Sequence, residues 1–183
     1  MPSVEKSLLG CFIELLPQCK SSKTSHKEGK GEIRIEPIKG KEIVCFFIID
    51  NDGARQALKI QSNALIERKR FICDCLIFWG RKNQTGKVSE ETFCLVELKG
   101  SDLKHAMKQI LNTHDHLWKS LESSLNKNKL RDIRKKAYIY KHGNTPKESK
   151  DKDFVALRKE LESTFDGNFA HSRDSDIGPF LRK

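Results

Sequence analysis

The residues with the clearest chemical potential are an acid and an amine two positions apart in an apolar run. The run is residues 93–100 (FCLVELKG), and its length and composition predict a buried strand. Side chains alternate along a strand, so Glu97 and Lys99 leave from the same face. Burying an ionised group is costly unless it is paired or bound to a metal. The pair therefore indicates a functional site.

A second acid, Asp74, interrupts the apolar run 70–79 (RFICDCLIFW). The turn-rich segment 80–87 (GRKNQTGK) joins the two runs and favours a hairpin, so the strands are expected to be antiparallel neighbours. Asp74, Glu97 and Lys99 would then line one polar pocket. Two carboxylates suit a hard divalent cation such as Mg²⁺. A nearby lysine can position a water molecule or offset charge that develops on a phosphate.

An acid on one strand followed by acid-x-lysine on the next resembles the central motif of the PD-(D/E)XK nuclease superfamily. Asp74 and then Glu97-Leu98-Lys99 stand in the matching places, although Cys73 replaces the proline often written before the first acid. Gln109 matches a glutamine that many members carry on the following helix. The resemblance covers about residues 70–142. It implies an α/β (α+β) fold with a restriction endonuclease-like αβββαβ core, a central mixed sheet flanked by helices.

The resemblance also implies a nuclease that hydrolyses phosphodiester bonds with Mg²⁺ or Mn²⁺, with DNA favoured over RNA. Asp74, Glu97 and the backbone carbonyl of Leu98 would hold the metal. Lys99 would orient the attacking water or stabilise transition-state charge, and Gln109 would hold the water or a phosphate oxygen. The family often takes a further acid from its opening helix. Here Glu14 is the first candidate for that metal ligand and Glu5 the second.

The expected elements follow the order of that core. Residues 8–16 predict an opening helix ended by Pro17, and 43–49 predict a strand. Helical spacing of apolar residues predicts one long amphipathic helix that begins at Ser101 or Asp102 and reaches residue 125. Residues 137–140 predict a short strand, and 154–165 a further helix.

Other metal-binding interpretations are weaker. Cys73, Cys75 and Cys94 could meet across paired strands, but zinc sites favour C-x(2–4)-C pairs that occur twice, and no second pair is present. His114 is interpreted as a packed histidine and His116 as a surface one. Two acids, Asp50 and Asp52, follow the strand 43–49 where they could point at a pocket, but turn residues are the favoured interpretation.

The net charge favours a polyanionic partner. The chain has 35 basic and 25 acidic residues, a formal charge of +10 and a pI near 9.3. Contacts from lysines to phosphates would give affinity without sequence choice, and the alternative is that these residues only solubilise the chain. The candidate nucleic-acid-binding residues form two clusters: Lys20, Lys23, Lys27, Lys30, Lys39 and Lys41, and then Arg134, Lys135 and Lys136.

The length of 183 residues fits one nuclease-like domain over 1–183. The lysine-rich stretch 18–32 is expected to be a flexible basic loop, and 168–183 either a docking tail or a loose one. No apolar run approaches the roughly 20 residues of a membrane span, so no membrane partner is expected. Residues 8–16 lack a signal-peptide pattern, and most of the six cysteines lie in apolar runs, as reduced thiols do. We therefore expect a cytoplasmic protein.

A non-catalytic role is the alternative. In it Glu97 and Lys99 form only an ion pair, and the chain binds nucleic acid or a partner as a subunit of a restriction, repair or phage-defence assembly. A homodimer or a larger assembly is also compatible with the nuclease interpretation, because the chain is about the size of a bare catalytic core with small additions.

Overall fold

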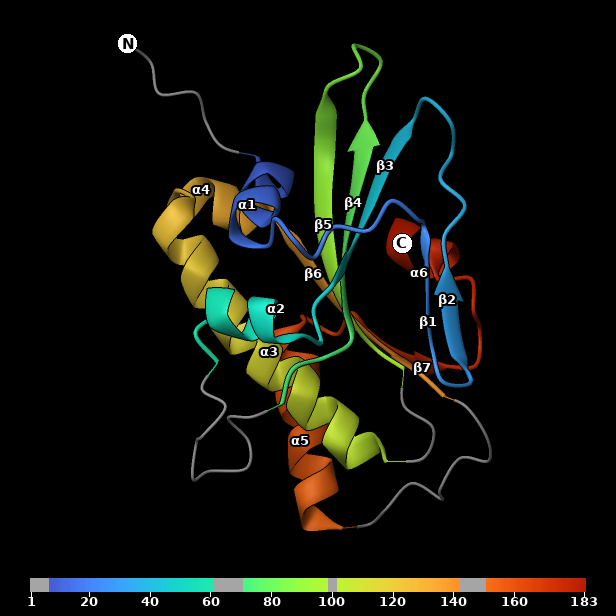
Figure 1. The fold of residues 1–183 in the computed structure, drawn as a ribbon, viewed down its shortest axis with the longest axis vertical. Helices are drawn as coiled ribbons and strands as arrows, with labels where there is room; N and C mark the ends of the chain where they lie inside the picture. The colour runs from blue at the N-terminus through green and yellow to red at the C-terminus, as the bar shows by residue number, and fades with distance from the viewer. Residues whose placement is uncertain (1–6, 61–70, 99–101, 142–150) are drawn as a thin grey trace.

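The computed structural model describes residues 7–60, 71–98, 102–141 and 151–183. They form a mixed α+β arrangement (Figure 1). Within these ranges no helix is both long and apolar enough to cross a membrane. The elements, in chain order, are α1 (Leu8–Leu15), β1 (Ser25–Glu28), β2 (Gly31–Arg34), β3 (Glu42–Ile48), α2 (Asp52–Ala57), β4 (Cys75–Lys82), β5 (Val88–Glu97), α3 (Leu103–Ser124), α4 (Lys127–Asp132), β6 (Arg134–Tyr140), α5 (Lys152–Thr164), β7 (Phe169–Ser172) and α6 (Gly178–Arg182).

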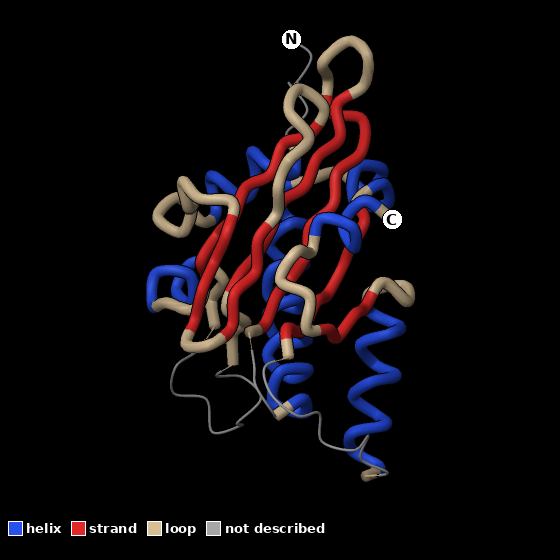
Figure 2. Tube along the Cα trace, turned by 90° about the vertical axis from the view of Figure 1, so that its right-hand side faces the viewer, coloured by secondary structure: helices blue, strands red, loops and turns tan. Residues whose placement is uncertain are grey.

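A five-stranded mixed sheet in the order β3-β4-β5-β6-β7 is the centre of the fold. The strands β3, β4 and β5 are antiparallel neighbours, as expected, and β6 and β7 run parallel to β5. Parallel neighbours need a crossover connection, and α3 lies in the one between β5 and β6. Figure 2, turned by 90°, shows the strands side by side, with the longest helix behind them and the short helix next to the C-terminus in front. The expected mixed sheet flanked by helices is confirmed.

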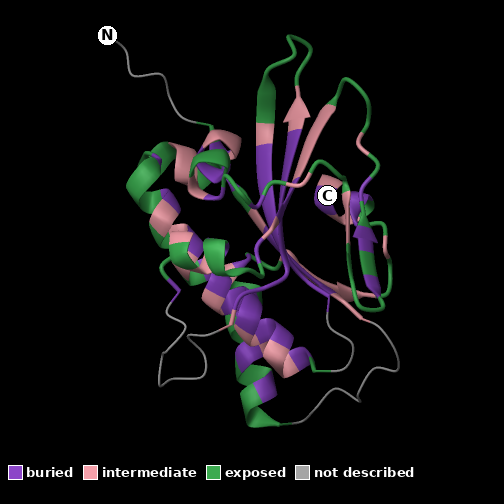
Figure 3. Cartoon of the chain, in the orientation of Figure 1, coloured by how far each residue is buried: buried purple, intermediate pink, exposed green. Residues whose placement is uncertain are grey.

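The sheet separates two layers of apolar packing. Residues of α1, α3 and α5 pack with Phe47, Leu76, Phe93 and Leu95 from one face of the sheet. Residues of β2 and α6 pack with Phe46, Ile77, Trp79 and Val96 from the other face. Figure 1 shows the long helices on one side of the sheet and the hairpin β1–β2 with α6 on the other. In Figure 3 the buried residues are concentrated in the middle of the sheet.

The opening helix α1 is fixed at both its start and its apolar face. The Ser7 side chain accepts a hydrogen bond from Gly10 N at 3.1 Å, the usual N-cap contact. The buried carboxylate of Glu91 on β5 accepts another from Leu8 N at 3.2 Å. On the apolar face, the Phe12 ring meets the edges of Phe47 and Phe93, with centroids 5.8 and 6.1 Å apart. The predicted opening helix is therefore confirmed as part of the core.

The long predicted helix is confirmed as α3, which Asp102 caps by accepting from His105 N at 2.9 Å. On its buried face, Thr113 accepts a hydrogen bond from Cys73 N at 2.9 Å and donates one to Gln109 O at 2.7 Å. These two bonds tie the helix to the segment that enters β4. Asp74 follows Cys73 directly, so α3 helps to fix the position of this candidate metal ligand.

His114 on α3 is packed against aromatic rings, as the sequence predicts. Its ring stacks on Trp118 with centroids 5.7 Å apart and meets Phe165 at 5.1 Å. Burial lowers the pKa of His114, and this outweighs the contact with Asp115, which raises it. His116, expected at the surface, is half-buried, and its Nδ1 lies 3.0 Å from Leu58 O.

The pKa of His114 predicts a loss of stability in mild acid. Because His114 is harder to protonate in the folded state, the unfolded chain binds more protons than the folded chain once the pH falls below about 6.5. The free energy of unfolding, measured by urea titration, should therefore fall between about pH 7 and pH 5. In His114→Phe, which keeps an aromatic ring, the free energy of unfolding should depend less on pH. Some pH dependence should remain, because burial also lowers the pKa of His26. An unchanged dependence would contradict the assignment.

The basic stretch expected to be a flexible loop contains an ordered hairpin instead. Strands β1 and β2 pair from Ser25 with Arg34 to Glu28 with Gly31. Gly29, at the first position of the two-residue turn, has φ +56°, which glycine adopts at little cost. Ile33 is fully buried against the sheet, and Ile35 is 2% exposed. These two buried side chains hold the hairpin against the sheet. The lysine-rich composition of the segment did not indicate this packing.

The C-terminal segment expected to be loose is also ordered. Strand β7 extends the sheet beside β6, and α6 buries Leu181 against the second face. Arg182 donates hydrogen bonds to both carboxylate oxygens of Glu42, at 2.8 and 3.0 Å, and to Glu36 O at 2.7 Å. The guanidinium lowers the pKa of Glu42. These contacts attach the chain end to the start of β3.

Candidate metal centre

Asp74 lies where three strands of the sheet converge, one residue before β4. It is 2% exposed, and its backbone carbonyl accepts a hydrogen bond from Ile49 N at 3.1 Å, just past β3. Its side-chain Oδ2 accepts a hydrogen bond from Leu98 N at 2.6 Å, just past β5. A charged acceptor makes this bond stronger than a neutral one. Asp74 therefore links the ends of β3 and β5 and has a fixed orientation.

Glu97 is the last residue of β5 and is fully buried. Cys75 pairs with Val96, so the next step of the same register sets Asp74 opposite Glu97. Opposite residues of an antiparallel pair have Cβ atoms about 4.5–5.5 Å apart. The pKa of the Cys73 thiol is raised well above its ordinary value. Burial is the largest cause, and the nearby charges of Glu97 and Asp74 add to it. The two predicted carboxylates are thus brought to one end of the sheet.

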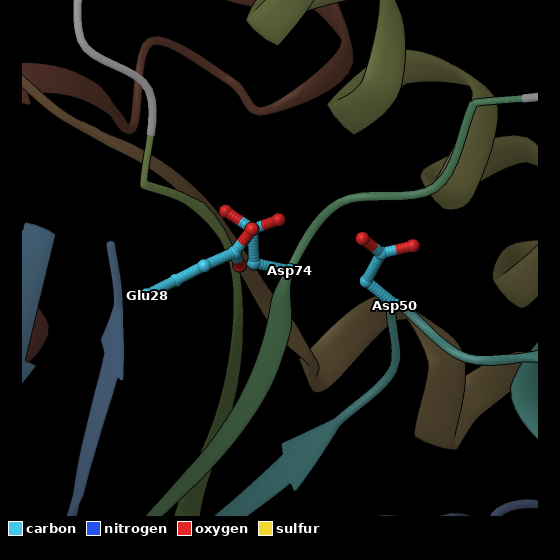
Figure 4. A group of neighbouring side chains, drawn as sticks. All are labelled: Glu28, Asp50 and Asp74. Atoms are coloured by element: carbon cyan, nitrogen blue, oxygen red, sulfur yellow. The ribbon is translucent and has the colours of Figure 1, made fainter.

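Two further acids approach Asp74. The carboxylate oxygens of Glu28, Asp50 and Asp74 lie within 4.8 Å of one another (Figure 4). Glu28 ends β1, and Asp50 follows β3, so the three come from separate elements. Glu28 and Asp50 are exposed, whereas Asp74 is buried. Within the described ranges this 4.8 Å group does not include Glu97. Asp74 is therefore the residue shared by the exposed acids and the buried pair.

The position of Asp50 differs from the favoured interpretation as a turn residue only. It precedes Asn51, which caps α2, so it does lie in a turn. Its carboxylate nevertheless joins Glu28 and Asp74, and it also accepts a hydrogen bond from Arg55 Nη2. Asp52 stands in the first turn of α2, 3.4 Å from Arg55 Nη1, and outside this group. Arg55 partly offsets the negative charge beside Asp74.

Gln109 is buried on α3, 5% exposed, and its side chain is aimed at the segment before β4. Its Nε2 donates a hydrogen bond to Ile72 O at 2.9 Å, two residues before Asp74. Within the described part of the chain, its Oε1 is buried and accepts no hydrogen bond. A buried amide oxygen without a donor carries a desolvation penalty. A ligand with an N–H or O–H group would relieve that penalty.

The remaining predicted ligands have separate outcomes. Lys99 and Glu5 lie outside the described residues. The backbone of Leu98 adjoins Asp74, as its N–H bond shows. Glu14 is exposed on α1 and lines a pocket of about 420 Å³ together with Leu16 and Gln56, apart from the Glu28–Asp50–Asp74 group. The structure therefore brings Asp74, Glu97 and Leu98 together and does not add Glu14 to the acids around Asp74.

The cysteines do not form a joint site. Cys73 packs in the helix-side layer, whereas Cys75 and Cys94 pack in the layer on the other face of the sheet. Burial raises the pKa of the Cys75 and Cys94 thiols, which favours their protonated form. All six cysteines are free and five are buried, which confirms the prediction of buried thiols. A zinc ion bound by thiolates does not fit this arrangement.

The two predicted basic clusters differ in the exposure of their side chains. In the second, Arg134 Nη1 lies 3.6 Å from Glu90, and Lys135 lies 3.9 Å from Asp166 and over the Trp118 ring. Lys136 differs from the expectation of a phosphate contact, because it is 2% exposed and donates a hydrogen bond to Phe180 O at 2.7 Å. Burial lowers the pKa of Lys136. The lysines of the first cluster, by contrast, are all exposed: Lys20, Lys23, Lys27, Lys30, Lys39 and Lys41.

The donor atoms at this end of the sheet suit a hard divalent cation. Carboxylates of Asp74 and Glu97 and a backbone carbonyl are oxygen donors of the type that Mg²⁺ and Mn²⁺ prefer. Like charges in a buried site repel each other, and a cation offsets the repulsion. The buried Gln109 Oε1 adds an acceptor for a bound water. Comparison with known proteins adds no family: no family model, curated protein or solved structure matches this chain.

Proposed function

We propose that this chain is a metal-dependent nuclease that hydrolyses phosphodiester bonds, with DNA as the favoured substrate. The observation that carries the proposal is the pairing of two buried acids, Asp74 before β4 and Glu97 at the end of β5. Two carboxylates at one end of the sheet are oxygen donors of the kind that Mg²⁺ and Mn²⁺ prefer. The sequence around them resembles the PD-(D/E)XK motif, which uses two such acids as metal ligands.

The order of the elements supports the restriction endonuclease-like core. An opening helix, three antiparallel strands, a helix and a parallel strand follow one another as α1, β3, β4, β5, α3 and β6. This is the αβββαβ order of that core. The small elements β1, β2 and α2 fall between its parts, and α4 between α3 and β6, without changing the pairing order of the sheet.

The residues at the centre would have different roles in the proposed reaction. Asp74, Glu97 and the Leu98 carbonyl would hold Mg²⁺ or Mn²⁺, which lowers the pKa of a bound water and polarises a phosphate. The hydrogen bond from Leu98 N to Asp74 Oδ2 holds that carboxylate in place. Gln109, fixed through Ile72 O, would present its Oε1 to the attacking water. By the resemblance, Lys99 would stabilise the charge that develops on the phosphate.

The alternative is a non-catalytic module that binds nucleic acid or a partner. The complete burial of Glu97 favours it, because a catalytic metal must be reached by substrate. The exposed lysines would then provide the function by contact with phosphates. In this alternative the carboxylates are structural, and a metal has no effect on the substrate.

A cleavage panel separates the two proposals. Labelled single- and double-stranded DNA and RNA would be incubated with the protein in Mg²⁺, Mn²⁺ or EDTA. A nuclease gives metal-dependent products, and the best substrate identifies its class. Binding to the panel without cleavage in either metal would favour the non-catalytic module.

A further inference from the structure

The turn of the β1–β2 hairpin lies directly against the candidate metal centre. The Glu28 carboxylate is within 4.8 Å of the Asp74 carboxylate (Figure 4). A Cβ atom added to Gly31 would lie only 3.2 Å from Leu98 Cβ and 3.4 Å from the Tyr140 ring. Only glycine permits this approach without displacing a neighbour. The turn and the end of β5 are therefore in close contact.

The hairpin is attached to the rest of the fold along its length. Ile33 and Ile35 are buried beside Trp79 and Val96 in the second layer. Arg34 N donates a hydrogen bond to Ser175 O at 2.7 Å, and Arg34 O accepts one from Ile177 N at 3.2 Å. The position of the turn beside Leu98 is consequently fixed by the same packing that holds the sheet together.

Two lysines lie at the end of the hairpin near the centre: Lys30 in the turn, and Lys27 on the outward face of β1, because side chains alternate along the strand and Glu28 lies on the inward face. Lys27 precedes Glu28, and Lys30 stands between Gly29 and Gly31. Both are exposed, and within the described ranges neither is in an ion pair. The cations of the second basic cluster, by contrast, are paired with Glu90 and Asp166 or buried against Phe180. The hairpin cations are thus available to an external anion.

A polyanion that approaches this centre meets negative charge from Glu28, Asp50, Asp74 and Glu97. Cations beside the centre would offset that repulsion and hold the chain of phosphates in register. On the outward face of the hairpin, Glu32 lies opposite Lys27, and Arg34 on the same face leaves an excess of cations there. The charge pattern therefore fits a phosphate backbone that passes across the turn.

We propose that the β1–β2 hairpin is the substrate-binding element of this centre and that Lys27 and Lys30 contact phosphates next to the one that is cleaved. The proposal rests on the proposed nuclease function for the identity of the site, but the binding itself does not need catalysis. Contacts of this kind give affinity without sequence preference. The partner is a nucleic-acid strand, and its phosphates are what the hairpin recognises.

The test compares two double variants with the same change of charge. Lys27→Gln/Lys30→Gln removes the proposed contacts, and Lys87→Gln/Lys119→Gln removes two exposed lysines that belong to neither basic cluster, one before β5 and one on α3. Lys87 and Glu97 are separated by the length of β5, about 30 Å of extended chain, and Lys119 lies about 24 Å along α3 from the start of that helix. Binding of a labelled DNA oligonucleotide would be measured by fluorescence anisotropy in EDTA, over a series of salt concentrations.

The hairpin variant should weaken binding about tenfold at low salt and reduce the slope of log affinity against log salt by about two. The control variant should change affinity less than about twofold. Equal losses in both variants, or no loss in the first, would overturn the proposal. So would a wild-type protein that does not bind the oligonucleotide.

Cleavage kinetics distinguish this proposal from the nuclease itself. In a cleaving protein, Lys27→Gln/Lys30→Gln should raise KM while kcat stays near the wild-type value, because the lysines bind ground state and transition state alike. A loss confined to kcat would contradict the role as a binding element. If the wild type binds but does not cleave, and the hairpin variant alone weakens binding, the nuclease proposal fails and the hairpin proposal stands.

Discussion

Asp74→Asn and Glu97→Gln should each lower metal-dependent cleavage by about a thousandfold or more. Each change keeps the size of the side chain and removes the charge that would hold the cation. In Asp74→Asn the amide oxygen can still accept the hydrogen bond from Leu98 N, so the local structure is preserved. The measurement is the single-turnover rate on the best substrate of the panel, at saturating Mg²⁺.

Asp132→Asn is the control for this experiment, because Asp132 is an exposed acid at the end of α4. It loses the same charge and should cleave within about twofold of the wild type, since isolated surface charges have small effects. The folding of all variants would be followed by urea unfolding. A folded Asp74→Asn or Glu97→Gln protein that cleaves at the wild-type rate would exclude these acids from catalysis.

Phe12→Ala should lower the free energy of unfolding by about 3–5 kcal/mol, the usual cost of truncating a buried phenylalanine. Phe12 is fully buried, and its ring contacts Phe47 of β3 and Phe93 of β5. The truncated side chain leaves a cavity that these rings cannot fill without moving. Urea titration would show the loss as a lower transition midpoint with an unchanged slope.

Ile13→Ala on the same helix supplies the comparison, because Ile13 is 39% exposed. Its truncation should cost less than about 1 kcal/mol. The difference between the two variants depends on α1 packing against β3 and β5 through Phe12. Equal losses in both variants would show that α1 does not pack on the sheet in this way.

The elements around the centre were predictable because their signals are local. The turn-rich segment 80–87 between two apolar runs indicates antiparallel strands, and β4 and β5 are paired as expected. The 3.6-residue repeat from Leu103 to Leu121 indicates one long helix, which α3 confirms. The buried acids Asp74 and Glu97 stood out for the same reason, as charges within apolar runs.

The β1–β2 hairpin was not predicted, because the residue composition of the segment was given more weight than its alternation of polar and apolar residues. Residues 32–36 (EIRIE) alternate polar and apolar, which is typical of a strand with one buried face. The surrounding glycine, serine and lysine residues suggested a flexible loop instead. Glu28 could not be predicted as a neighbour of Asp74, because its position depends on how this hairpin packs across the sheet.

The burial of Lys136 could not be predicted from the neighbouring residues in the sequence. The residue follows two other cations, which suggested a solvated cluster. Its amine reaches the carbonyl of Phe180 in α6, 44 positions away in the sequence. The short apolar segment that forms α6 has too few residues to show a repeat. Contacts between distant segments, and not the residue types, decide which lysines remain available to a ligand.

Diffraction from crystals soaked in Mn²⁺ would show whether Asp74 and Glu97 hold a metal, because the anomalous signal of the ion locates it independently of activity. We expect an anomalous peak in contact with the carboxylates of both Asp74 and Glu97, and no such peak in Asp74→Asn crystals treated in the same way. A soak that yields no peak at Asp74, or a peak held by the exposed Glu28 and Asp50 without Glu97, would contradict this expectation.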